Sequence, residues 1–144
     1  MKTQIIKKMR QSLQESGLPL TVSAESSSEG LVVEVHSKKL NGKLLVGFDS
    51  ANKSVRLTFY FQEQTAGETK GILYETLNEL NVNLPVGHFC IDPHSGAVIM
   101  QTSYFLTGDF DPAKFRLTVG GLLGEGAMYL PLIKKQTIAE PPSV

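Results

Sequence analysis

The sequence lacks the features that mark a secreted or membrane protein. It contains no tryptophan and a single cysteine, Cys90. Because there is only one cysteine, an internal disulfide is impossible and a small disulfide scaffold is excluded. No apolar run approaches the ~20 residues that a membrane span needs, and the N-terminus is too polar for a signal peptide. We therefore expect a cytoplasmic protein with no membrane partner.

An excess of charge of one sign is also missing. Lysine plus arginine and aspartate plus glutamate both number 14, whereas a protein that neutralises many phosphates normally has a basic excess. We therefore expect no nucleic-acid partner. Four basic residues gather near the N-terminus, and we interpret them as the solvated face of a helix: Lys2, Lys7, Lys8 and Arg10.

Catalytic motifs are absent as well. There is no Gly-x-Ser-x-Gly elbow, and Cys90 stands among apolar neighbours, where a cysteine usually acts as a small hydrophobe. The aspartates fall at expected turns and caps, where their side chains bond the backbone: Asp49, Asp92, Asp109 and Asp111. The glycine-rich run 120–126 matches neither the dinucleotide fingerprint nor the P-loop. The sequence predicts no enzyme and no cofactor.

What the sequence does contain is the composition of one globular domain. Its 144 residues are 41% hydrophobic and 19% charged, and a chain of this length buries roughly two thirds of its unfolded surface on folding. We expect residues 1–137 to form a single domain and residues 138–144, which contain Pro141-Pro142, to form a flexible tail.

The first half of the chain predicts a helix followed by strands. Residues 3–16 repeat apolar side chains about four apart, which is typical of an amphipathic helix. Residues 31–36 and 54–62 alternate apolar and polar side chains, which indicates half-buried antiparallel strands. Asn41-Gly42 predicts the hairpin turn before a strand through Leu44, Val46 and Phe48. Whether residues 21–28 form a strand stays open.

The second half predicts a helix, a hairpin and a last helix. Thr65 to Glu68 has the form of a capping box for a helix over 66–80. Val86–Asp92 and Ala97–Leu106 read as the two strands of a hairpin around a turn at 92–96. Asp111-Pro112 starts a helix toward Lys135. Whether that helix is continuous through 114–126 stays open. Residues 114–119 also alternate as a strand would, and the glycines that follow could then form a phosphate-binding loop.

This order of elements predicts the fold class. We expect an α+β domain in which an antiparallel β-sheet carries helices packed on one face, in the order α-β-β-β(-β)-α-β-β-α.

Two sets of residues are candidates for binding. His88, Cys90, Asp92 and His94 are metal-ligand types spaced two apart, so an ideal strand would place them on one face. Pro93 and the following turn break this alternation, so we favour a plain strand and turn and predict no metal. The second set would form a partly apolar outer face of the sheet for a protein partner or a dimer: Val32, Leu45, Tyr60 and Tyr104. Its alternative is that a helix of the same chain covers it.

The stretch from Ile72 to Leu106 resembles the YbjN-like family, within the superfamily of type III secretion chaperone-like folds. The matching features are Leu77 to Asn81 at a helix end, Gly87-His88-Phe89 opening a strand, and Asp92 and Gly96 in the hairpin turn; Ala127 to Pro131 matches a stretch near the end of such domains. The resemblance implies an α+β domain that often dimerises and binds proteins. It carries over no catalytic residue.

We therefore predict a non-enzymatic protein-interaction domain, chaperone-like or regulatory, that forms a homodimer. The alternative is a small-molecule or metal-binding domain that uses the strand and turn at 88–94.

Overall fold

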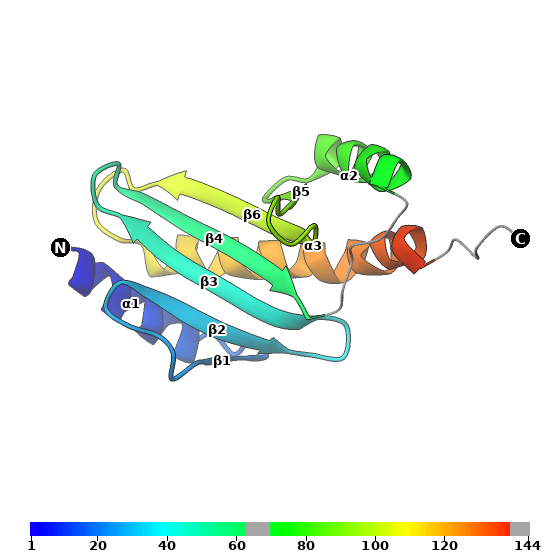
Figure 1. The fold of residues 1–144 in the computed structure, drawn as a ribbon. Coiled ribbons are helices and arrows are strands. Elements are labelled where there is room, and N and C mark those ends of the chain that lie inside the picture. The colour runs from blue at the N-terminus through cyan, green and yellow to red at the C-terminus, as the bar shows by residue number, and fades with distance from the viewer. Residues whose placement is uncertain (63–69, 139–144) are drawn as a thin grey trace, which may run out of the picture.

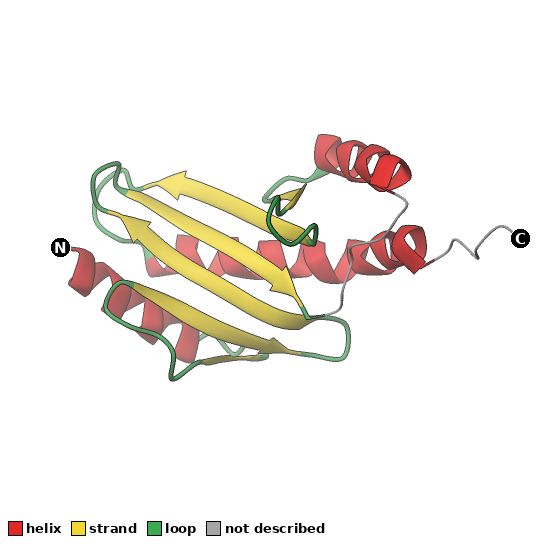
Figure 2. Cartoon of the chain, in the orientation of Figure 1, coloured by secondary structure: helices red, strands yellow, loops and turns green. Residues whose placement is uncertain are grey.

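A six-stranded antiparallel sheet and three helices make up the fold in the computed structural model, which describes residues 1–62 and 70–138 (Figure 1). The strands follow the order β1-β2-β3-β4-β6-β5 across the sheet. Figure 2 shows α1 and α3 on the same side of the sheet. The elements are α1 (Lys2–Gln14), β1 (Leu20–Val22), β2 (Gly30–His36), β3 (Asn41–Asp49), β4 (Ser54–Phe61), α2 (Lys70–Asn83), β5 (His88–Ile91), β6 (Val98–Phe105) and α3 (Pro112–Ile138). The predicted fold class and element order are confirmed.

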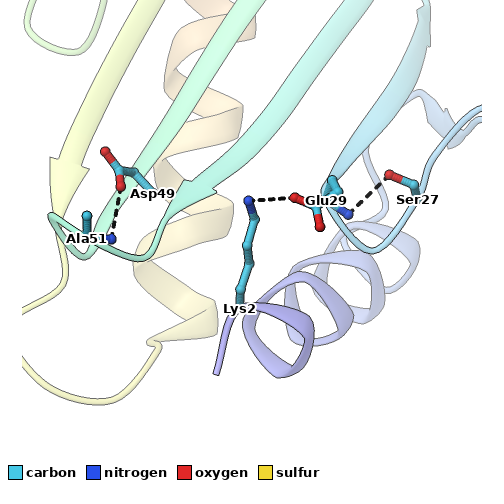
Figure 3. A network of polar contacts seen from close by, with 5 residues as sticks. All are labelled: Lys2, Ser27, Glu29, Asp49 and Ala51. Atoms are coloured by element: carbon cyan, nitrogen blue, oxygen red, sulfur yellow. Dashed lines mark hydrogen bonds and ion pairs between the residues drawn. The ribbon is translucent and has the colours of Figure 1, made fainter.

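Helix α1 forms as its apolar spacing predicts. The exposed Lys7 and Lys8 lie on its solvent face. Its apolar side chains, three or four residues apart, are all buried in the core: Ile5, Ile6, Met9 and Leu13. The chain leaves the helix through Gly17, whose φ of +74° suits glycine better than residues with a Cβ atom. At the other end, Lys2 Nζ lies 2.9 Å from Glu29 Oε2 in the β1–β2 connection (Figure 3). Lys2 is therefore paired with a carboxylate.

The alternating side chains of the long strands divide between two faces of the sheet. The inner face, toward α1 and α3, is apolar across three neighbouring strands: Leu31, Val33, Val35, Leu44, Val46, Phe48, Val55, Leu57 and Phe59. Cross-strand pairs such as Leu44 with Phe59 join these side chains into one core.

The first hairpin turn lies at 37–40, so the prediction that Asn41-Gly42 forms the turn is wrong. The Ser37 hydroxyl accepts a hydrogen bond from Leu40 N at 2.9 Å and donates one to Leu40 O at 3.0 Å. Asn41 and Gly42 already belong to β3, where they oppose His36 and Val35. Gly42 is needed there because a Cβ atom would lie 2.1 Å from the Tyr60 carbonyl oxygen.

Helix α2 reaches farther than the predicted end at residue 80, because it continues to Asn83. Leu73 and Leu77, two apolar residues of the predicted helix, are buried. The predicted capping box at 65–68 and the Ile72 side chain lie outside the described residues.

Helix α3 is continuous through the glycine-rich run, so the alternative of a strand and phosphate loop is wrong. Asp111 Oδ1 accepts hydrogen bonds from Ala113 N and Lys114 N at 3.0 and 3.3 Å, as the predicted N-cap should. Gly126 lets the helix approach the sheet, because a Cβ atom there would lie 2.7 Å from Met100 Cε. Ile138, predicted to begin the tail, ends α3.

A buried carboxylate on α3 holds the chain segment that leads into β5. Glu125, 9% exposed, accepts hydrogen bonds from Val86 N at 2.9 Å and Gly87 N at 2.8 Å, one to each oxygen. Thr102 Oγ1 donates to Val86 O at 2.8 Å from the neighbouring strand β6. This segment is therefore fixed to both the helix and the sheet.

Replacing Gly42 by alanine should destabilise the fold, because the new Cβ atom would collide with backbone as well as with the Phe59 ring. We expect the free energy of unfolding to fall by about 2 kcal/mol, as in other overpacked sites, measured by urea denaturation. Gly47→Ala on the same strand is the control, since nothing lies within 4 Å of its added Cβ atom. Equal stabilities of the two variants would contradict the predicted role of Gly42.

Candidate protein-binding surface

The side of the sheet away from α1 and α3 carries apolar side chains. The strand register places Val32 opposite Leu45, and Leu45 opposite Thr58, all pointing away from the buried face. Tyr60 follows one pair farther along β4, opposite Ile99 on β6. Leu45 is 39% exposed and Tyr60 37%, while Val32 is half-buried. We call the three residues Val32, Leu45 and Tyr60 the outer-face patch.

The described helices leave this outer face open. The buried side chains of α1 and α3 join the core that also contains the inner-face residues, and α2 packs beside β5 and α3 at one edge of the sheet (Figure 1). Within residues 1–62 and 70–138, therefore, no helix covers the patch.

Tyr104 lies on the inner face, so its predicted place in the outer-face patch is wrong. It stands opposite Val55, which is fully buried, and packs against the core. Lys114 Nζ lies 4.8 Å from the centre of its ring. Both faces of β6 carry apolar or aromatic residues, including Ile99 and Phe105 on the outer side, so alternation alone did not reveal which set faces the core.

The Tyr104 hydroxyl is buried and has no hydrogen-bond partner among the described residues. Burial, and secondarily the negative charge of Asp111, raises its pKa from an ordinary 10.0 to about 12.

A hollow of about 510 Å³ lies at the end of β2, β3 and β4, next to the outer-face patch. Charged and polar side chains line it together with Tyr60 and Phe61: Glu34, His36, Asn41, Lys43 and Gln62. His36 Nε2 lies 3.0 Å from Thr21 Oγ1, and Lys43 Nζ lies 3.8 Å from Glu25 Oε2. At this end, the apolar patch is therefore bordered by polar side chains, as in many protein interfaces.

The four candidate metal ligands do not converge. Asp92 is used by its own turn, where Oδ1 accepts from His94 N at 3.0 Å and Oδ2 from Ser95 Oγ at 3.1 Å; the bond from His94 N is the main reason why the pKa of Asp92 is lowered. The exposed His88 and the half-buried Cys90 lie on β5. Among the residues that the structure describes, no three His, Cys, Asp or Glu side chains could hold a metal ion together.

Cys90 is also poorly suited to act as a nucleophile. Burial, followed by the charge of Asp92, raises the pKa of its thiol above the ordinary value of 9.0. A raised pKa keeps the sulfur protonated near neutral pH, and the thiol reacts much more slowly than the thiolate.

The sequence reasoning missed that Asn81 closes one edge of the sheet. Its side-chain oxygen accepts a hydrogen bond from Phe89 N at 2.6 Å, and its side-chain nitrogen donates to Phe89 O at 2.9 Å. Phe89 belongs to the edge strand β5, so these are backbone groups that an added strand would otherwise use. An asparagine near the end of a helix and a few residues before a strand is too common a pattern to have signalled this.

A similar contact lies near the opposite edge of the sheet. The Ser26 hydroxyl accepts from Val32 N at 2.8 Å and donates to Val32 O at 3.0 Å. Side chains thus occupy backbone groups near both edges, whereas the outer-face patch remains accessible.

Comparison with known proteins defines the class of fold. A chain of the crystal structure of the ExsC–ExsE complex matches with a TM-score of 0.64 and 15% sequence identity, over 92% of this chain and 96% of that one. A chain of the HopA1–SchA chaperone–effector complex matches with a TM-score of 0.53 and 12% identity, over 92% and 91%. The protein therefore shares the fold of these two chains, one of which belongs to a chaperone–effector complex, in agreement with the fold that the sequence resemblance implied.

No protein-family model matches the chain, and no curated protein matches it either. Within residues 1–62 and 70–138, no helix has both the length and the apolar character needed to cross a membrane.

The raised pKa of Tyr104 predicts a loss of stability at alkaline pH. The folded protein holds this proton more tightly than the unfolded chain, so the stabilising difference is complete below pH 10 and is lost as the pH rises from 10 toward 12. Tyr104→Phe should flatten this part of the stability profile, measured by urea denaturation between pH 9 and about 12. Tyr74→Phe, at an exposed tyrosine, is the control and should leave the profile unchanged; an identical slope in the wild-type protein and Tyr104→Phe would contradict the assignment.

Removing the Asn81 side chain should loosen the edge of the sheet. Asn81→Ala leaves Phe89 N and O without their partner, and we expect a loss of about 2 kcal/mol in unfolding free energy. Hydrogen exchange should show faster exchange at the Phe89 amide. Asn83→Ala, at an exposed position near the end of the same helix, is the control; unchanged protection of Phe89 in Asn81→Ala would show that the contact is unimportant.

Proposed function

We propose that this protein is a non-enzymatic, chaperone-like binding domain that holds a segment of a partner protein against its outer-face patch. The observation that carries the proposal is the accessible apolar face of the sheet at Val32, Leu45 and Tyr60, opposite a face that is filled by helices. Burying such side chains against a partner contributes about 25 cal/mol per Å² of apolar surface.

The structural neighbours support a protein partner. Both were solved as complexes of two different proteins, and one of them is described as a chaperone–effector complex. At 12–15% identity these likenesses concern the fold alone, so the transfer of a chaperone role to this chain is our proposal.

We extend the proposal to a homodimer that works in the cytoplasm, in a chaperone or regulatory role, as the resemblance to YbjN-like proteins implies. The equal numbers of acidic and basic residues favour a protein partner over nucleic acid. The alternative of a metal or small-molecule site at 88–94 gains no support from the geometry, because Asp92 is bonded within its own turn.

Substitutions in the outer-face patch test the proposal. A tagged protein is used to isolate partners from its native lysate, and a recurrent partner is then purified and titrated by calorimetry. Leu45→Glu and Tyr60→Glu should each weaken binding at least tenfold, which corresponds to about 1.4 kcal/mol, because each introduces a charge into an apolar contact.

The matched control is Ser103→Glu, which adds the same charge at an exposed position of the same sheet face. It should bind the partner like the wild-type protein. Binding that is unaffected by Leu45→Glu and Tyr60→Glu would refute the assignment of this face, provided that both variants melt at the wild-type temperature.

A further inference from the structure

A second hollow surface lies on the helical side of the molecule, where α3 extends past α1. With 27 residues α3 is about 40 Å long, whereas the 13 residues of α1 span about 20 Å. The polar contacts between them involve the first turns of α3: Ser12 Oγ lies 3.4 Å from Pro112 O and 3.4 Å from Arg116 Nη1. Figure 1 shows α3 continuing behind the sheet well beyond α1.

The flank of α3 from this contact onward forms one side of an apolar groove. Hollows of about 300 and 440 Å³ follow each other along the helix and share Leu18. The walls come from α3, from the α1–β1 connection and from the turn between β2 and β3; their apolar members include Leu18, Leu40, Leu117 and Leu123. The floor is wide because Cβ atoms added at Gly120 or Gly124 would meet nothing within 4 Å.

The charged residues that line this groove all carry the same sign. They are Lys38, Lys39 and Arg116, and no carboxylate of residues 1–62 or 70–138 lines either hollow. Lys38 and Lys39 are exposed, and within the described part of the chain neither forms an ion pair. In a chain whose formal net charge is zero, this local excess of cations selects an occupant that bears negative charge.

The walls of the groove also favour a helical occupant over a strand. At the two ends of the turn at 37–40 the backbone groups are already paired, since Ser37 N donates to Leu40 O at 3.0 Å and Leu40 N donates to the Ser37 hydroxyl at 2.9 Å. An added strand would need free backbone groups, whereas a helix binds through its side chains. A second copy of this chain, placed groove to groove by a two-fold axis, would bring the lysines of both copies together and be repelled.

We propose that this groove binds an amphipathic helix of a partner protein, with apolar side chains on one face and acidic residues along its margins. The inference rests on the proposed protein-binding function but uses the helical side of the molecule, opposite the outer-face patch. The apolar face of the partner helix lies over Gly120 and Gly124, and its carboxylates lie against Lys38, Lys39 and Arg116.

A pair of designed peptides tests the charge preference. The first is a helical peptide of about 14 residues, or four turns, with leucine on one face and glutamate beside it; the second carries lysine in place of each glutamate. Measured by fluorescence anisotropy, the acidic peptide should bind at least tenfold more tightly than the basic one, and added salt should weaken its binding.

Substitutions in the groove test its location. Gly124→Leu fills the floor and should abolish binding of the acidic peptide, while its melting temperature should not fall, because leucine favours a helix more than glycine does. Gly124→Ala is the graded control, which gains helix propensity but leaves the groove open. The double variant Lys38→Glu, Lys39→Glu should weaken binding about tenfold, whereas Lys7→Glu, Lys8→Glu, with the same change of net charge on α1, should not.

Four outcomes would overturn the inference: no binding of the acidic peptide to the wild-type protein, equal binding of both peptides, undiminished binding to Gly124→Leu, or a dimer that Gly124→Leu converts to a monomer in light scattering. The last outcome would identify a second copy as the occupant. Leu45→Glu separates this inference from the proposed function. Peptide binding that is lost in Leu45→Glu but kept in Gly124→Leu places the peptide on the outer-face patch, so the groove inference fails while the proposed function stands.

Discussion

The contact between Glu125 and the segment before β5 is the interaction on which the arrangement of the molecule depends. A carboxylate that is 9% exposed is costly to bury unless its oxygens are hydrogen-bonded, and here they accept from Val86 N and Gly87 N. A Cβ atom at Gly87 would lie 2.4 Å from Leu122 on the same helix. The contact therefore ties α3 to the entry of β5, and so sets which face of the sheet the helix covers.

The different roles of the two faces of the sheet follow from this attachment of α3. With α1 and α3 on the inner face, the large apolar side chains that β2, β3 and β4 direct to this face are buried in the core. Val32, Leu45 and Tyr60 point the other way and remain available. Near the edges of the sheet, Asn81 and Ser26 already bond backbone groups of Phe89 and Val32. A partner protein is therefore better bound through side chains, on the outer face or in the groove beside α3, than by adding a strand at those positions.

The structural neighbours share this architecture at 12–15% identity. Such low identity is compatible with one fold because burial constrains the pattern of apolar positions much more than the particular residues. Surface charge is under no such constraint. The cationic groove of Lys38, Lys39 and Arg116 therefore has to be tested on this chain.

Much of the fold was predictable from local periodicity. Side chains at every second position of a strand, or every third to fourth of a helix, share a face regardless of the rest of the protein. The predicted helix over 3–16 and the predicted strand over 54–62 therefore each bury one face in the structure: Ile5, Met9 and Leu13 on the helix, and Val55, Leu57 and Phe59 on the strand. The Asp111 cap and the element order are local in the same sense.

The errors arose where the outcome depended on distant residues. The turn lies at 37–40, and Gly42 instead belongs to β3, where it passes close to Tyr60 on β4. Tyr104 lies on the inner face because its register with Val55 decides between the two apolar sides of β6. The spacing of His88, Cys90, Asp92 and His94 could not reveal that the turn itself bonds Asp92.

The sequence by itself determined which side chains share a face and where most helices and strands lie, since those properties repeat over a few residues. Only the tertiary structure decided which face is covered, which side of β6 is buried, and where a groove remains beside α3. These depend on contacts between segments far apart in the chain, such as Glu125 with Val86 and Gly87, and no local pattern encodes such a contact.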